Sequence, residues 1–323
     1  MIALLSSSRL MSQPATPAVQ VVVTNYHGWT NAIVLGNGLV EAVVVPDAGR
    51  VMQFRFTGST SGPFWENPKL FGKTSANNNW NTTGAFGGDK SWPAPQSDWK
   101  GGWPPPAGFD GSPYTCEITN GIVNLTGVID SAYKIQVTRT IELAAHQPVM
   151  RINTVFRRFD SAIRTNAVSV WVITQVTDPA GIYVPIPSPS IFAPANYHQL
   201  GSGMPARFTN ANGLISFTRD TVTQRHLGFD AGSLAWVGTN LSLRIDASRV
   251  TGLSETNYPN GGCLTVVYTN PNPTPYEELE CFGPLTNLLA GQTMSFVTTY
   301  TLFNRTENDP EAEGRKILGL PAR

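Results

Sequence analysis

The chain has 323 residues, of which 41% are hydrophobic and 14% are charged, a composition typical of a globular protein. Its 22 basic and 22 acidic residues balance, which gives no electrostatic reason to expect nucleic acid or an anionic membrane surface as a partner. No stretch approaches the roughly 20 apolar residues needed to cross a bilayer, so membrane insertion is not expected either.

Residues 1–17 combine a short apolar start with a run rich in Ser, Gln, Pro and Ala. This segment lacks the positively charged leader of a secretory signal peptide. We expect it to be disordered or leader-like. The scarcity of Lys and the abundance of Thr, Asn and Gly favour a periplasmic or secreted location, on composition alone.

Alternation of apolar and polar residues with a period of two recurs along the chain, and no long window shows the 3.6-residue period of an amphipathic helix. This pattern predicts an all-β protein. The predicted strands are 21–24, 32–35, 39–45, 51–56, 114–119, 122–125, 133–138, 150–157, 168–176, 213–218, 234–237, 241–245, 264–269, 276–281 and 294–303. About fifteen strands without a linker indicate a single large antiparallel two-sheet β-sandwich over 18–305.

Residues 58–114 interrupt the strand pattern with Gly, Pro and Asn, and they contain five of the eight tryptophans. An irregular segment of this length in a compact domain is usually functional or disordered. Disordered segments are poor in aromatic residues, so we expect this one to be packed. A second irregular stretch, 185–205, is expected to form another loop over the same mouth, and it carries His198.

The most informative motif is GGDKSWPAPQ at 87–96. Its two glycines permit a turn that a side chain would block, and its two prolines fix the chain after that turn. The polar and aromatic residues of the motif and just beyond it are Asp89, Lys90, Trp92, Gln96 and Trp99. Sugars present hydroxyls beside weakly apolar C–H faces, so this mixture suits a carbohydrate pocket. The alternative is a tight loop whose tryptophans only plug one end of the sandwich.

The tail, 306–323, has acidic residues early and Arg315 and Lys316 late, as in a short helix. The three cysteines, Cys116, Cys263 and Cys281, are too far apart for a zinc motif, and we expect neither a metal nor a cofactor. Cys263 and Cys281 fall on two strands of a predicted hairpin. A disulfide between them is conceivable in an exported chain, although buried free thiols are the stronger expectation.

Over most of its length the chain resembles the galactose mutarotase-like superfamily, and most closely a bacterial branch of it. GGDKSWPAPQ is similar to the Gly-Gly-x-Pro-x-x-x-Pro-Gln stretch that lines the sugar pocket of hexose-phosphate mutarotase relatives. The acidic strand at 278–281, the turn at 289–292 and the last strand ending at 300–302 are similar to the closing segment of the family. The resemblance implies a β-sandwich, a carbohydrate partner and an aldose 1-epimerase-like isomerase.

In aldose epimerases the acidic strand carries the general base, and the resemblance assigns that role to Glu280. Glu278 lies two residues away and is expected on the same side of the strand. Two enclosed carboxylates on one face raise one of their pKa values by repulsion, which suits acid–base work. Glu278 is a substrate-binding candidate, although an ordinary surface acid is the stronger interpretation of it.

The histidine that acts as the family's acid is expected on the strand at 166–176, but the sequence has Trp171 there. An indole cannot deliver a proton, so we expect Trp171 to stack on substrate or pack in the core. Lys90 and His198 remain as candidates to assist Glu280. Lys90 alternatively bridges to a carboxylate such as Glu280, and Arg50 is expected to turn inward beside a carboxylate partner.

Three functions remain open at this stage. The first is the isomerase. The second is a non-catalytic carbohydrate-binding protein, which the missing histidine favours. The third is a polysaccharide lyase or hydrolase on the same kind of sandwich, which a lysine near a uronate would favour. The sequence determines neither the sugar and its linkage, nor calcium dependence, nor the oligomeric state.

Overall fold

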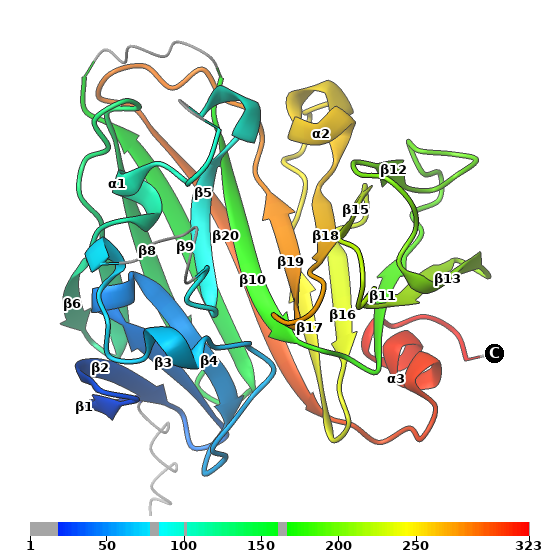
Figure 1. Ribbon diagram of the computed structural model, residues 1–323, viewed down its shortest axis with the longest axis horizontal. Coiled ribbons are helices and arrows are strands. Elements are labelled where there is room, and N and C mark those ends of the chain that lie inside the picture. Colours follow the sequence, from blue (N-terminus) through cyan, green and yellow to red (C-terminus); the bar gives the residue numbers. More distant parts are fainter. Residues whose placement is uncertain (1–18, 78–83, 100–101, 161–166, 323) are drawn as a thin grey trace, which may run out of the picture.

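The computed structural model describes residues 19–77, 84–99, 102–160 and 167–322. Across these ranges twenty strands form two antiparallel sheets of ten strands each (Figure 1). The prediction of an all-β, two-sheet sandwich is confirmed. The predicted disorder of 1–17 concerns residues outside the described ranges.

The first sheet contains the strands that carry the site. In spatial order they are β1 (Gln20–Tyr26), β2 (Trp29–Gly36), β3 (Val40–Val45), β4 (Arg50–Phe56), β5 (Asp89–Ala94), β10 (Ser169–Thr177), β19 (Tyr276–Phe282), β18 (Thr265–Thr269), β15 (Arg225–Phe229) and β12 (His198–Gln199). Strands from the beginning, middle and end of the chain thus meet at its centre.

The second sheet packs against one face of the first. Its strands in spatial order are β13 (Ala206–Ala211), β14 (Leu214–Thr218), β11 (Gly181–Pro185), β16 (Ser233–Val237), β17 (Leu241–Asp246), β20 (Thr293–Asn304), β9 (Val149–Arg158), β8 (Ile135–Leu143), β7 (Ile122–Thr126) and β6 (Thr115–Thr119). Three α-helices occur in the described residues: α1 (Ala107–Asp110), α2 (Pro259–Gly262) and α3 (Pro310–Ile317). None of them is long and apolar enough to span a bilayer.

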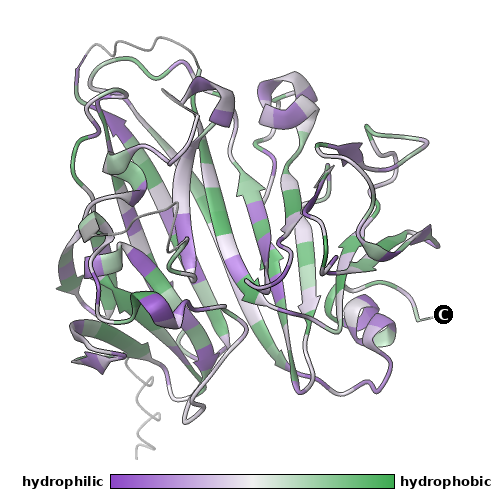
Figure 2. Cartoon of the chain, in the orientation of Figure 1, coloured by the Kyte–Doolittle hydropathy of each residue, from purple (hydrophilic) through white to green (hydrophobic). Residues whose placement is uncertain are grey.

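The core lies between the two sheets, where apolar side chains alternate with outward polar ones. Burial alternates at every residue of β8, as the period of two predicts. Strand β10 is buried along nearly its whole length, because both of its faces are covered. Figure 2 shows hydrophilic and hydrophobic residues as bands of colour along the strands. Helix α3 packs on the outer face of the second sheet, against β11 and β16.

The motif at 87–96 differs from its prediction as a turned loop, because most of it forms the central strand β5. Strand β5 pairs with β10 over six positions but with β4 only at Val51–Asp89. A proline weakens a sheet least where one edge of its strand is unpaired, which explains how Pro93 lies inside a central strand. Strands β11, β12, β13 and β15 were also not predicted, because they are short and weakly patterned.

The two glycines of the motif position β5 through close backbone contacts. Gly87 and Gly88 have φ values of +99° and +67°. A Cβ on Gly87 would lie 2.1 Å from the carbonyl oxygen of Trp65, and one on Gly88 would lie 2.4 Å from that of Val51. Both positions therefore require glycine, for conformation and for space.

All three cysteines are free, so Cys263 and Cys281 form no disulfide. Both are buried, and burial raises the pKa of the Cys263 thiol to about 12. These two residues are core side chains, which confirms the expectation of buried free thiols.

Candidate functional site

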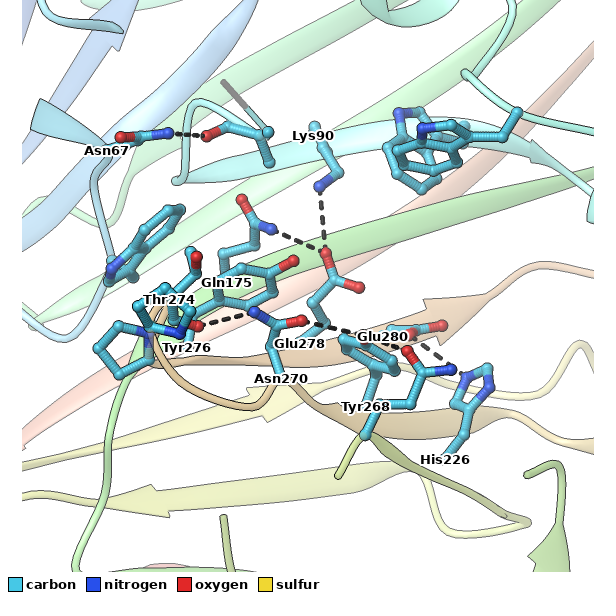
Figure 3. Close-up of a pocket in the computed structure, with 18 of the residues that line it drawn as sticks. Asn67, Lys90, Gln175, His226, Tyr268, Asn270, Thr274, Tyr276, Glu278 and Glu280 are labelled. Atoms are coloured by element: carbon cyan, nitrogen blue, oxygen red, sulfur yellow. Dashed lines mark hydrogen bonds and ion pairs between the residues drawn. The ribbon is translucent and has the colours of Figure 1, made fainter. Parts of the chain in front are cut away.

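A cavity of about 870 Å³ opens on the face of the first sheet that points away from the second sheet (Figure 3). Its floor is formed by alternate residues of five adjacent strands, namely Lys90, Trp92, Trp171, Gln175, Tyr276, Glu278, Glu280, Tyr268 and His226. Loop residues at 65–69, 84–85 and 273–275 supply the walls. The cavity therefore depends on the order of the strands, which brings remote segments together.

Glu280 and His226 form one polar pair in this cavity. His226 Nε2 lies 3.6 Å from Glu280 Oε1, and Trp171 Nε1 donates a 2.8 Å hydrogen bond to Glu280 Oε2. Burial raises the pKa of Glu280, although His226 and Trp171 oppose that effect. Burial alone would lower the pKa of His226, but the neighbouring Glu280 carboxylate outweighs it and the pKa is raised. The pair thus joins a carboxyl group and an imidazole, two side chains of the kind that act as general base and general acid.

A second polar group lies beside this pair. Lys90 Nζ is 3.2 Å from Glu278 Oε1, and Gln175 Nε2 donates to the same oxygen at 2.9 Å. Lys90 also lies over the ring of Trp92, 4.4 Å from its centroid. Burial lowers the pKa of Lys90, and the Glu278 carboxylate opposes this effect. The pairing cancels most of the charge in this part of the cavity.

Gln175 Oε1 is an acceptor without a hydrogen-bond partner, although Gln175 is fully buried. A buried polar atom left unsatisfied costs about 1–3 kcal/mol. Because this oxygen has almost no accessible surface, it belongs to the packed wall beneath the cavity and is not a contact for a ligand.

Aromatic side chains stand at both ends of the cavity. At one end Trp171 lies perpendicular to Trp92, with ring centroids 5.4 Å apart, and Trp103 is 44% exposed beside them. At the other end the rings of Trp65 and Tyr276 are 4.8 Å apart. Indole and phenol faces suit the C–H faces of sugar rings.

The structure brings six of the predicted residues into this cavity: Lys90, Trp92, Gln96, Trp171, Glu278 and Glu280. Gln96 is exposed at the rim, at the start of a short 3₁₀ turn. Glu278 is not an ordinary surface acid, because its side chain is 12% exposed and binds Lys90 and Gln175. The roles assigned to these residues remain predictions.

Asp89 requires a correction, because it does not face the cavity. Its carboxylate accepts hydrogen bonds from Arg139, from Thr174 Oγ1 at 2.6 Å and from the Tyr300 hydroxyl at 2.5 Å. Adjacent residues of a strand point to opposite faces, so with Lys90 in the cavity Asp89 must enter the space between the sheets. Asp89 is therefore part of the core.

Arg50 and Trp99 also require correction, since both lie behind the cavity wall. Arg50 Nη2 is 2.5 Å from an oxygen of Asp110, whose other oxygen accepts a 2.7 Å hydrogen bond from Trp92 Nε1. Trp99 Nε1 donates to the Pro93 carbonyl at 2.8 Å, and its ring packs edge-on against Trp92. Arg50 turns inward beside a carboxylate, as expected, but that carboxylate is Asp110, the hydrogen-bond partner of Trp92. Trp99 contacts Trp92 directly. Neither Arg50 nor Trp99 lines the cavity.

His198 was expected to reach the mouth, but it lies on the edge strand β12 and stacks on Phe192. The histidine that lines the cavity is His226, which lies on β15. In the sheet, His226 pairs with Tyr268 of β18, and Tyr268 pairs with Glu278 of β19. The imidazole therefore lies near the acidic strand. No local pattern around His226 reveals this pairing, because β15 and β18 are far apart in the sequence.

The likeness to solved structures confirms the resemblance at the level of the fold, which is galactose mutarotase-like. Sequence comparison matches the chain to no protein-family model and to no curated protein. Solved structures are similar to this chain, among them the following three. A galactose mutarotase-like protein from Lactobacillus casei has a TM-score of 0.54 and 10% identity, over 84% of this chain and 100% of its own.

A galactose mutarotase-related enzyme from Lactobacillus acidophilus has a TM-score of 0.54 and 9% identity, over 85% of this chain and 98% of its own. A protein from Escherichia coli K12, described as a candidate aldose 1-epimerase, has a TM-score of 0.52 and 10% identity, over 84% of this chain and 98% of its own. The described residues of this chain contain no group of three or more His, Cys, Asp or Glu side chains that could hold a metal ion.

A partly buried acid beside the cavity makes stability depend on pH. Glu66, between the lining residues Trp65 and Asn67, accepts hydrogen bonds of 2.9 Å from the Tyr26 hydroxyl. Burial raises the pKa of Glu66 from 4.5 to about 7, although the bonds from Tyr26 and Gln53 oppose this. The folded protein thus binds a proton at Glu66 that the unfolded chain releases above about pH 4.5, so stability falls as pH rises from there to about 7.

Glu66→Gln should remove this contribution. We expect the free energy of unfolding of the wild type to fall, relative to that of the variant, between pH 4.5 and 7. Urea denaturation of both proteins across this range measures the difference. Parallel curves for the two proteins would show that Glu66 titrates normally.

Proposed function

We propose that the protein is an aldose 1-epimerase-like isomerase that interconverts the anomers of a sugar, with Glu280 as the base and His226 as the acid. The observation that supports this most is the 3.6 Å contact between Glu280 Oε1 and His226 Nε2 in an aromatic-lined cavity. The shared fold with mutarotase-like proteins supports the reaction class.

Mutarotation requires two proton transfers at oxygens bonded to the same carbon. The Glu280 carboxylate takes the proton of the anomeric hydroxyl while protonated His226 donates a proton to the ring oxygen. The bond between the anomeric carbon and the ring oxygen breaks, and the anomeric oxygen becomes that of an aldehyde. Rotation of the aldehyde group and the reverse transfers close the ring as the other anomer and restore both residues.

The electrostatics of the pair suit this sequence. The raised pKa of His226 favours the imidazolium form that the first step needs. Trp171 holds one oxygen of Glu280, which leaves the other oriented toward His226. Trp171 thus takes a supporting role at the position where the family has its histidine. Because His226 supplies the acid, Lys90 is not needed in that role. In its pair with Glu278, Lys90 orients hydroxyls of the sugar.

His226→Gln should lower kcat by roughly 10²–10⁴-fold, because a positioned general acid contributes about that much. KM should change less, since the amide retains hydrogen-bonding capacity. Exchange NMR on a panel of free aldoses and reducing disaccharides measures the rate. His198→Gln is a matched control, because His198 does not line the cavity, and it should leave the rate unchanged. Equal rates for His226→Gln and the wild type would reject the assignment.

The second candidate is a carbohydrate-binding protein without catalysis, which the tryptophan at position 171 favours. In that case the wild type binds sugars with saturation but does not accelerate anomer exchange. The pairing of Lys90 with Glu278 gives no support to a lyase acting on uronates, because the lysine charge is already neutralised.

A further inference from the structure

We infer that the cavity takes a neutral reducing oligosaccharide of at least two rings, whose second ring stacks on Trp65 and Tyr276. These two residues are called the outer aromatic pair. The inference rests on the proposed function, because it places the reducing-end ring at Glu280 and His226. It adds a subsite that the acid–base pair does not require.

The length of the cavity floor is the first argument. Trp171 and Thr177 are six residues apart on β10, and Thr177 is opposite Tyr276 of β19. At about 3.3 Å per residue, the two aromatic ends are about 20 Å apart along the strand. The cavity volume of about 870 Å³ lies near the top of the roughly 300–1,000 Å³ range of sites that enclose drug-sized ligands. A single hexose at Glu280 would leave the Tyr276 end empty.

The outer aromatic pair is fixed in position before a ligand arrives. The backbone N–H of Trp65 donates to the Gln175 carbonyl at 2.8 Å, and the Trp65 carbonyl accepts from Gly88 N at 2.8 Å. The side chains of Trp65 and Tyr276 nevertheless remain partly exposed to the cavity. A fixed and accessible aromatic surface is favourable for stacking, because little ordering is needed on binding.

The charge between the two ends is the last argument. Gln175 is four residues from Trp171 and two from Thr177 on β10, and its Nε2 donates to Glu278. Because the adjacent Lys90 and Glu278 neutralise each other, this part of the site favours a neutral ring.

The test compares affinity with ligand length. Calorimetric titration of the wild type should use glucose and galactose beside maltose, cellobiose, lactose and maltotriose. At least one reducing disaccharide should bind about tenfold more tightly than its own monosaccharide. Trp65→Ala should abolish this gain while leaving monosaccharide affinity unchanged. Equal affinity of every disaccharide and its monosaccharide, or a gain that persists in Trp65→Ala, would overturn the inference.

Controls separate this inference from the proposed function. Trp103→Ala, at the other end of the cavity, should weaken monosaccharides and disaccharides by the same factor. Tyr276→Leu provides a second test of the outer pair should Trp65→Ala fail to fold. Length-dependent binding that persists in Glu280→Gln, in which turnover is lost, supports both proposals. Length-dependent binding by a wild type that shows no anomer exchange supports the subsite and rejects only the isomerase.

Discussion

Glu280→Gln should abolish catalysed anomer interconversion, with a loss of kcat of roughly 10²–10⁴-fold, while the protein still folds and binds sugar. The amide cannot accept a proton from the anomeric hydroxyl, so the first step of the reaction fails. Its oxygen can still accept the hydrogen bond from Trp171 Nε1, which at present is 2.8 Å long. The change therefore removes chemistry and preserves shape.

The fold should tolerate this substitution. Burial raises the pKa of Glu280, which means that the folded protein disfavours its charged form. A neutral amide avoids that cost, so we expect no loss of stability near neutral pH. Exchange NMR for the rate, calorimetry for binding and urea denaturation for stability measure the three quantities separately.

Glu278→Gln is the matched control, because Glu278 lies two residues away on the same face of β19. It should weaken sugar binding through Lys90 and Gln175 and leave kcat closer to the wild-type value. A loss of kcat in Glu278→Gln with normal turnover in Glu280→Gln would show that Glu278, and not Glu280, is the base.

Asp89→Asn should destabilise the protein by about 3–5 kcal/mol, because it leaves the buried Arg139 guanidinium without its charge partner. Arg139 is fully buried, and its other contacts are the Asp89 carbonyl at 2.9 Å and Thr154. The substitution preserves volume, so the effect reports on charge. Urea denaturation measures it, with exposed Glu117→Gln on β6 as a control that should remain within about 0.5 kcal/mol of the wild type.

This experiment also separates two views of the motif at 87–96. The sequence indicated that Asp89 binds substrate, whereas the structure places it between the sheets with Arg139, Thr174 and Tyr300. If Asp89→Asn keeps wild-type stability but loses sugar binding, the core position is wrong. If it loses stability while the remaining folded protein binds sugar normally, the core position is supported.

The fold class could be predicted because β-structure leaves a local trace. Alternation along segments such as 135–143 reflects one covered face, and the continuous apolar run of 169–177 reflects two. The same alternation predicted that Glu278 and Glu280 share a face, and both line the cavity. The strand at 89–94 could not be predicted in this way, because glycines, prolines and tryptophans conceal its period.

The sequence alone determined an antiparallel sandwich, a tryptophan-rich motif and a pair of acids near the carboxyl end, because each depends on neighbouring residues. Only the tertiary structure decided that His226 and not His198 meets Glu280, and that Lys90 enters the cavity while Asp89 enters the core. The physical reason is that strand order and register bring together residues far apart in the sequence, such as Lys90 and Glu278, 188 positions apart, and hydrophobic burial across the whole sheet fixes them.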